Sequence, residues 1–194
     1  KPPISTSSTV IKALPGVEYG YTPRDSSPTS SSTLPKGVAI PDLDRPVIIP
    51  KEFIPEVAVE AAARMKELTA SLRRNPGNAT LWAALGLERK GINDYEGSKE
   101  AFEYAFALVP QSAVFADNLG VLYGYYLKDV KKAEQRFLTA VELEPEAVYR
   151  YLRLFEFYTY VLNDSAKAKA ILERGLRAHP GEASLTALLD ELKP

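Results

Sequence analysis

Apolar residues recur at helical spacing through most of the chain, and this pattern begins abruptly near residue 54. Strong helix formers dominate from there, in the segment EVAVEAAARMKELTASLRR. Its apolar residues fall on one stripe: Val59, Ala62, Met65, Leu68 and Leu72. Pro55 suits a first helical turn, while Asn75 and Pro76 suit a helix end. These features predict a leading helix over residues 54–75.

Beyond residue 75 the pattern repeats. Three prolines, Pro110, Pro145 and Pro180, follow one another at intervals of 35 residues, and Pro76 stands 34 residues before the first. A leucine lies nine residues after the proline that precedes each unit, at Leu85, Leu119 and Leu154. A period of this size is typical of a solenoid built from stacked helical units.

Polar, small and bulky residues hold fixed places within each unit. An aspartate, at Asp94, Asp129 and Asp164, precedes the second helical stretch, where a short carboxylate caps a helix N-terminus. Small residues follow at Ser98, Ala133 and Ala168 and again at Ala105, Ala140 and Gly175. Bulky ones stand between them at Phe102, Phe137 and Leu172. Each unit is therefore expected to be a closely packed antiparallel helix pair.

These positions resemble the tetratricopeptide repeat (TPR). The first unit supplies Trp82, Leu85, Gly86, Ser98, Phe102, Ala105 and Pro110. The second supplies Leu119, Gly120, Tyr123, Ala133, Phe137, Ala140 and Pro145. The third keeps Tyr151, Leu154, Tyr158, Ala168 and Pro180, but has Phe155 in place of a glycine and Gly175 in place of an alanine. The bulky Phe155 is expected to push the third pair apart.

The resemblance implies an all-α superhelical solenoid over residues 54–194, with about seven helices. The repeats span residues 76–110, 111–145 and 146–180, and residues 181–194 form a closing helix. Units two and three carry one residue more than the usual 34, which we place between their helices, around Lys128 and Asn163.

Residues 1–53 have a different composition, with nine of the 15 prolines and thirteen serines or threonines among the first 50 residues. Proline at this density rules out a long helix, so we expect an extended arm. Its apolar clusters predict that it docks on its own body or on a neighbouring subunit, through Val10, Ile11, Leu14, Val17, Tyr19, Tyr21, Val47, Ile48 and Ile49.

Composition argues against several other functions. The 24 basic and 25 acidic residues nearly cancel, which disfavours nucleic acid or anionic lipid as a partner. There is no cysteine, and His179 is the single histidine, so neither a metal site nor a cofactor is expected. No apolar run reaches the roughly 20 residues of a membrane span. No nucleophile, phosphate loop or paired-acid motif points to an enzyme.

TPR arrays bind peptides or proteins along the concave face formed by the first helices of the pairs. Carried onto this sequence, that face includes Lys90 and Thr159, and its candidate partner-binding residues are Leu87, Asp117, Asn118, Val121, Tyr125, Tyr149, Arg153, Glu156 and Tyr160. One branch of the family clamps the C-terminal carboxylate of chaperones. Only Asn118 and Arg153 match that clamp, so chaperone-tail binding is not expected.

Two functions stay open. One is a non-enzymatic interaction scaffold that binds a protein or peptide, with another copy of itself in a head-to-tail oligomer or filament as one candidate partner. The other is an accessory or regulatory subunit of a secretion or envelope complex, tethered through the arm to a removed membrane anchor. The serine- and proline-rich arm and the start at Lys1 favour an extracytoplasmic or cell-surface location.

Overall fold

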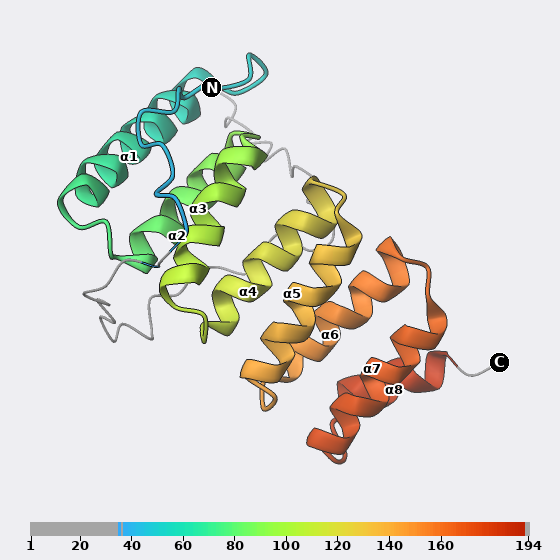
Figure 1. Ribbon diagram of the computed structural model, residues 1–194. Coiled ribbons are helices and arrows are strands. Elements are labelled where there is room, and N and C mark those ends of the chain that lie inside the picture. Colours follow the sequence, from blue (N-terminus) through green and yellow to red (C-terminus); the bar gives the residue numbers. More distant parts are fainter. Residues whose placement is uncertain (1–34, 36, 193–194) are drawn as a thin grey trace, which may run out of the picture.

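The computed structural model describes Pro35 and residues 37–192, and the described part of the chain consists of helices joined by short connections, without strands (Figure 1). The α-helices are α1 (Pro55–Arg74), α2 (Ala79–Gly91), α3 (Tyr95–Leu108), α4 (Ala113–Val121), α5 (Val130–Leu143), α6 (Val148–Glu156), α7 (Ser165–Ala178) and α8 (Ala183–Glu191). Short π-helical turns extend α4 and α6: η1 (Leu122–Tyr126) and η2 (Phe157–Val161). This part of the chain has eight α-helices, one more than the seven expected. The expected number was one too low, since a leading helix, three helix pairs and a closing helix add up to eight.

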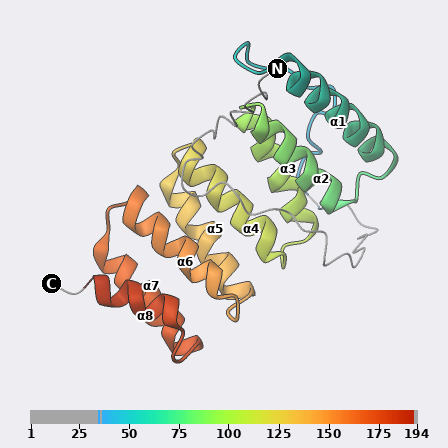
Figure 2. The same ribbon diagram turned by 180° about the vertical axis from the view of Figure 1, so that it is seen from behind.

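The helices stack in chain order as three pairs, α2 with α3, α4 with α5, and α6 with α7. Helix α1 covers one end of the stack and α8 covers the other, and both views show the same order (Figures 1 and 2). A continuous apolar core runs through all the pairs and includes Trp82, Leu119 and Leu154. The all-α solenoid expected from the sequence is confirmed.

The turns inside the three pairs share one geometry. A residue with positive φ ends each first helix, at Asn93 (66°), Lys128 (60°) and Asn163 (51°). The aspartate that follows caps the second helix: the side chains of Asp94, Asp129 and Asp164 accept hydrogen bonds from the backbone amides of Gly97, Lys132 and Lys167. The N-caps predicted from the sequence are confirmed.

The extra residue of units two and three lies inside the first helix and not in the connection that follows it. In η1 the amide of Leu127 donates to the carbonyl of Leu122 over 3.0 Å, and in η2 Leu162 donates to Phe157 over 3.1 Å, both five residues apart. Lys128 and Asn163, where we placed the insertion, occupy the same left-handed position as Asn93 in unit one. The helix therefore absorbs the inserted residue as a π turn.

Glycine lets the first two pairs pack closely. A Cβ atom on Gly86 would lie 2.9 Å from the ring of Phe102, and one on Gly120 would lie 2.6 Å from the ring of Phe137. In the third pair the buried Phe155 takes the glycine's place. The backbones of α6 and α7 approach each other closely at fewer positions than those of α4 and α5, although the helices have the same lengths. This difference agrees with the separation expected from Phe155.

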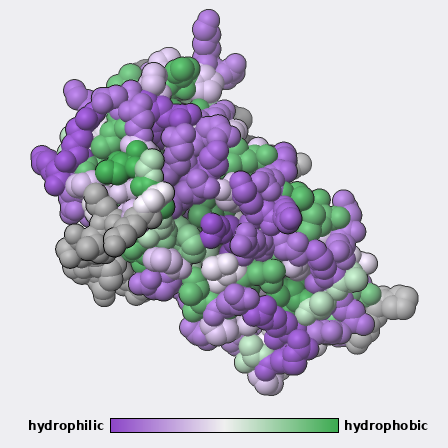
Figure 3. All heavy atoms as spheres, in the orientation of Figure 1, coloured by the Kyte–Doolittle hydropathy of each residue, from purple (hydrophilic) through white to green (hydrophobic). Residues whose placement is uncertain are grey.

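The described part of the arm lies against its own body. Leu43 and Ile49 pack on the core, whereas Val47 and Ile48 are 42% and 77% exposed, so the chain's own body does not bury these two, and their docking on a neighbouring subunit stays a prediction. The remaining predicted docking residues, from Val10 to Tyr21, lie outside the described residues. Figure 3 shows apolar surface beside the arm, at the α1 end of the stack.

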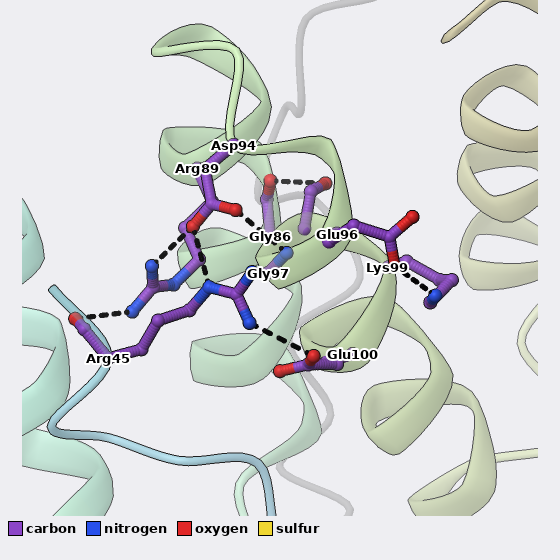
Figure 4. A network of polar contacts seen from close by, with 9 residues as sticks. Arg45, Gly86, Arg89, Asp94, Glu96, Gly97, Lys99 and Glu100 are labelled. Carbon is purple, nitrogen blue, oxygen red and sulfur yellow. Dashed lines mark hydrogen bonds and ion pairs between the residues drawn. The ribbon is translucent and has the colours of Figure 1, made fainter. Parts of the chain in front are cut away.

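Arg45 anchors the arm to the first helix pair (Figure 4). Its Nε donates to Asp94 Oδ2 over 3.1 Å, and its Nη1 donates to Glu100 Oε1 over 3.0 Å. The same Asp94 oxygen accepts from Nη1 of the buried Arg89 over 2.6 Å, and Arg89 Nη2 donates to the Arg45 carbonyl over 3.3 Å. A Cβ on Gly97 would lie 2.4 Å from that Asp94 oxygen, so glycine makes room for the network.

We expect Arg45→Ala to loosen the arm without unfolding the helices. The change removes two charge-assisted hydrogen bonds at a partly exposed site, so amide exchange across residues 42–49 should accelerate roughly fivefold. Hydrogen-exchange mass spectrometry measures it. The comparison variant is Arg73→Ala, which removes only the exposed ion pair between α1 and Asp44 of the arm and should change the exchange far less. Exchange in Arg45→Ala no faster than in the wild type would show that Arg45 does not anchor the arm.

Candidate functional site

Polar side chains from all three pairs meet on the face formed by the first helices. We call them the first-helix cluster: Lys90 on α2, Asp117 on α4, Tyr125 on η1, and Arg153 and Glu156 on α6. Arg153 Nη1 lies 3.9 Å from Asp117 Oδ2. Arg153 also acts electrostatically on Lys90 and on Tyr125, and Glu156 acts on Tyr125. The structure therefore brings together four of the predicted binding residues, with Lys90 beside them.

Asp117 is the most constrained member of the cluster. Its side chain is only 13% exposed, and its Oδ1 atom is buried with no hydrogen-bond partner among the described residues. Burial raises the pKa of this carboxyl, and the nearby positive charge of Arg153 partly offsets that rise. A buried acceptor without a donor is costly, so a donor supplied by a ligand would relieve that cost.

Lys90 adds a charged hydrogen-bond donor to the cluster, and Tyr125 adds a neutral one. Burial lowers the pKa of the Lys90 ammonium, and the positive charge of Arg153 lowers it further. Lys90 Nζ sits 5.8 Å from the centre of the Tyr126 ring. Burial raises the pKa of Tyr125 to about 12, and the charge of Glu156 adds to this. The hydroxyl is thus a neutral donor at ordinary pH.

The other predicted binding residues lie elsewhere or serve the fold. Val121 is 7% exposed and belongs to the core, and Leu87 packs on that core, so neither offers much surface to a partner. Asn118 donates from Nδ2 to the Val114 carbonyl of its own helix over 3.0 Å. Tyr149 and Tyr160 are exposed, by 40% and 70%.

Arg150 shapes this face although the sequence did not single it out. It is 2% exposed, its Nε donates to Glu144 Oε2 over 3.0 Å, and its guanidinium lies 4.7 Å from the centre of the Tyr149 ring. The buried Arg150 therefore stabilises the position of the exposed Tyr149 ring through a cation–π contact. The one signal in the sequence for this role of Arg150 was its position next to Tyr149, a predicted binding residue.

The described residues offer no sign of metal chemistry or of a membrane span. They contain no group of three or more histidines, cysteines or acids arranged to hold a metal ion. No helix among them is both long and apolar enough to cross a bilayer. His179 Nε2 lies 2.9 Å from the Pro145 carbonyl, and its ring packs edge-on against Tyr151, so this histidine joins the third pair to the second.

Comparison with known proteins finds no matching family model and no matching curated protein. Among solved structures, the chain is similar to one described as the first TPR of Spaghetti (RPAP3) bound to the HSP90 peptide SRMEEVD. The two are 22% identical with a TM-score of 0.47, over 59% of this chain and 89% of that chain. The stacked helix pairs with their shared turns give the described part of this chain the fold of an all-α helical solenoid.

Proposed function

We propose that this protein is a non-enzymatic interaction scaffold that holds an extended peptide segment of a protein partner on the face of α2, α4 and α6. The observation that carries the proposal is the buried Asp117 Oδ1, an acceptor left without a donor in the middle of the first-helix cluster. Arg153 lies 3.9 Å from its other oxygen, Tyr125 interacts electrostatically with Asp117, and Lys90 of the first pair interacts with Arg153.

An extended peptide offers what these groups lack. Its backbone presents N–H donors and carbonyl acceptors in alternation, and Asp117 and Glu156 accept while Lys90 and Tyr125 donate. The mixture of signs keeps the cluster nearly neutral, which suits a peptide backbone better than a strongly charged ligand. The exposed rings of Tyr149 and Tyr160 add apolar surface with a polar tip, the kind of side chain enriched at interfaces.

Selection of peptides from a random displayed library tests the proposal without presuming a sequence. We expect peptides enriched on the wild-type protein to bind Lys90→Met/Glu156→Gln at least fivefold more weakly, because the change removes one donor and one acceptor charge while keeping side-chain size. Isothermal titration calorimetry measures the affinities.

The matched control is Lys131→Met/Glu142→Gln, which removes the same two charges from exposed positions on α5. It should bind the selected peptides as tightly as the wild type does. A library that yields no binder, or equal affinity in both double variants, would contradict binding on the first-helix face.

The two finer hypotheses, head-to-tail self-assembly and tethering to a secretion or envelope complex, stay predictions. The arm contacts that the structure describes are within one chain, through Arg45 and the first helix pair. They support the version in which the arm docks on its own body.

A further inference from the structure

A pocket lies between the arm and α3, on residues that do not belong to the first-helix cluster. Residues 38–42 of the arm and Glu100, Glu103 and Tyr104 of α3 line a pocket of about 360 Å³. This size falls within the range of small-ligand pockets, which is about 300–1,000 Å³. The arm side is apolar apart from Asp42, and Val38 and Ile40 are 41% and 47% exposed there. The pocket thus has an apolar wall and an acidic wall.

The lining is negatively charged. It holds three carboxylates, Asp42, Glu100 and Glu103, and no lysine or arginine. Arg45 neutralises part of this charge through Glu100 Oε1, and the Tyr123 hydroxyl donates to Glu103 Oε1. The second oxygen of each glutamate has no hydrogen-bond partner among the residues that the structure describes. A carboxylate accepts at both oxygens, so each retains capacity for a further donor.

Tyr104 supplies an independent sign of a missing partner. This tyrosine lines the pocket, is 1% exposed and packs edge-on against Trp82. Its hydroxyl is buried without a hydrogen-bond partner in the described part of the chain. Buried tyrosine hydroxyls in folded proteins usually find one. The orphaned hydroxyl lies on a residue that lines the same pocket as the three carboxylates.

We infer that this pocket binds a basic side chain, arginine or lysine, presented by a polypeptide partner. The aliphatic stem packs against Val38 and Ile40, the cation pairs with Glu100 and Glu103, and a donor or carbonyl of the same segment satisfies the Tyr104 hydroxyl. The one basic residue of their own helix is Lys99, which pairs with Glu96 and also interacts electrostatically with Glu103 and Glu100 without lining the pocket. The site is separate from the first-helix cluster and does not depend on the function proposed for it.

Nuclear magnetic resonance titration of the full chain tests this inference. The probe is the blocked tripeptide acetyl-Gly-Arg-Gly-amide, and its neutral counterpart carries citrulline in place of arginine. We expect saturable shifts confined to residues 38–42 and 100–104 with the arginine probe alone. The variant Asp42→Asn/Glu103→Gln keeps the local acceptors and removes two charges, so it should bind the probe at least fivefold more weakly.

Two further variants separate this site from other acidic surfaces. Glu142→Gln/Glu146→Gln removes two exposed carboxylates elsewhere, and Lys90→Met/Glu156→Gln alters the first-helix cluster; both should bind the arginine probe as the wild type does. Equal shifts with citrulline, unchanged affinity in Asp42→Asn/Glu103→Gln, or saturation at another place on the protein would overturn the inference.

Discussion

Asp94→Ala is expected to lower the free energy of unfolding by about 3–5 kcal/mol, because it leaves the buried guanidinium of Arg89 without its carboxylate partner. Asp94 caps α3 and accepts from Arg89 and Arg45 at a single oxygen. The Arg89 side chain is 3% exposed, so water cannot replace the lost carboxylate. Urea unfolding followed by circular dichroism measures the change.

The matched control is Asp164→Ala in the third pair. Asp164 caps α7 through the amide of Lys167, but no buried arginine depends on it. Its loss should therefore cost only about 1 kcal/mol, the usual cost of an N-cap. Similar losses in the two variants would show that Asp94 contributes as a cap alone.

The effect of Asp94 should also depend on pH. Hydrogen bonds from Gly97 and Arg89 and the charge of Arg45 lower the pKa of this carboxyl, although burial opposes them. A carboxyl whose pKa is lower in the folded state than in the unfolded state stabilises the protein at pH values above its unfolded-state pKa, about 3.9. That contribution is lost as the pH falls through the folded-state pKa. The difference in the free energy of unfolding between the wild type and Asp94→Ala should therefore become smaller below pH 4.

Local chemistry explains why much of this fold could be predicted from the sequence. The three N-caps follow from a short carboxylate at a turn, and the pairs follow from small and large residues that alternate at a fixed period. Each of these signals lies within one unit of about 35 residues and is repeated in the next. The members of the first-helix cluster were accessible from the sequence, since Lys90, Asp117, Tyr125, Arg153 and Glu156 sit at positions that the TPR resemblance implies.

Features that depend on distant or ambiguous contacts could not be predicted. Arg45 and Asp94 are 49 residues apart, and no period links the arm to the body. Gly97 was the one local hint, because units two and three carry lysine at that position. An inserted residue fits equally well into a connection or a helix by sequence, and only the backbone hydrogen bonds of η1 and η2 distinguish the two.

Gly120→Ala is expected to destabilise the protein by about 2 kcal/mol, although alanine favours helices over glycine by about 1 kcal/mol. A Cβ at this position would lie 2.6 Å from Cδ1 and 2.7 Å from Cε1 of Phe137. That ring is 1% exposed and packs against Phe157, with the ring centres 5.2 Å apart, so it has little room to move. Overpacking therefore outweighs the gain in helix propensity, and thermal unfolding measures the balance.

Gly91→Ala is the matched control, since no atom lies within 4 Å of a Cβ built on this exposed helical glycine. It should stabilise the protein by up to about 1 kcal/mol, the opposite sign. The third pair suggests a rescue, because there Phe155 and the smaller Leu172, both buried, take the places that Gly120 and Phe137 hold in the repeat. Phe137→Leu in the Gly120→Ala background should therefore cost less than the sum of the two single changes. Strict additivity would show that the ring of Phe137 is not what excludes a side chain at residue 120.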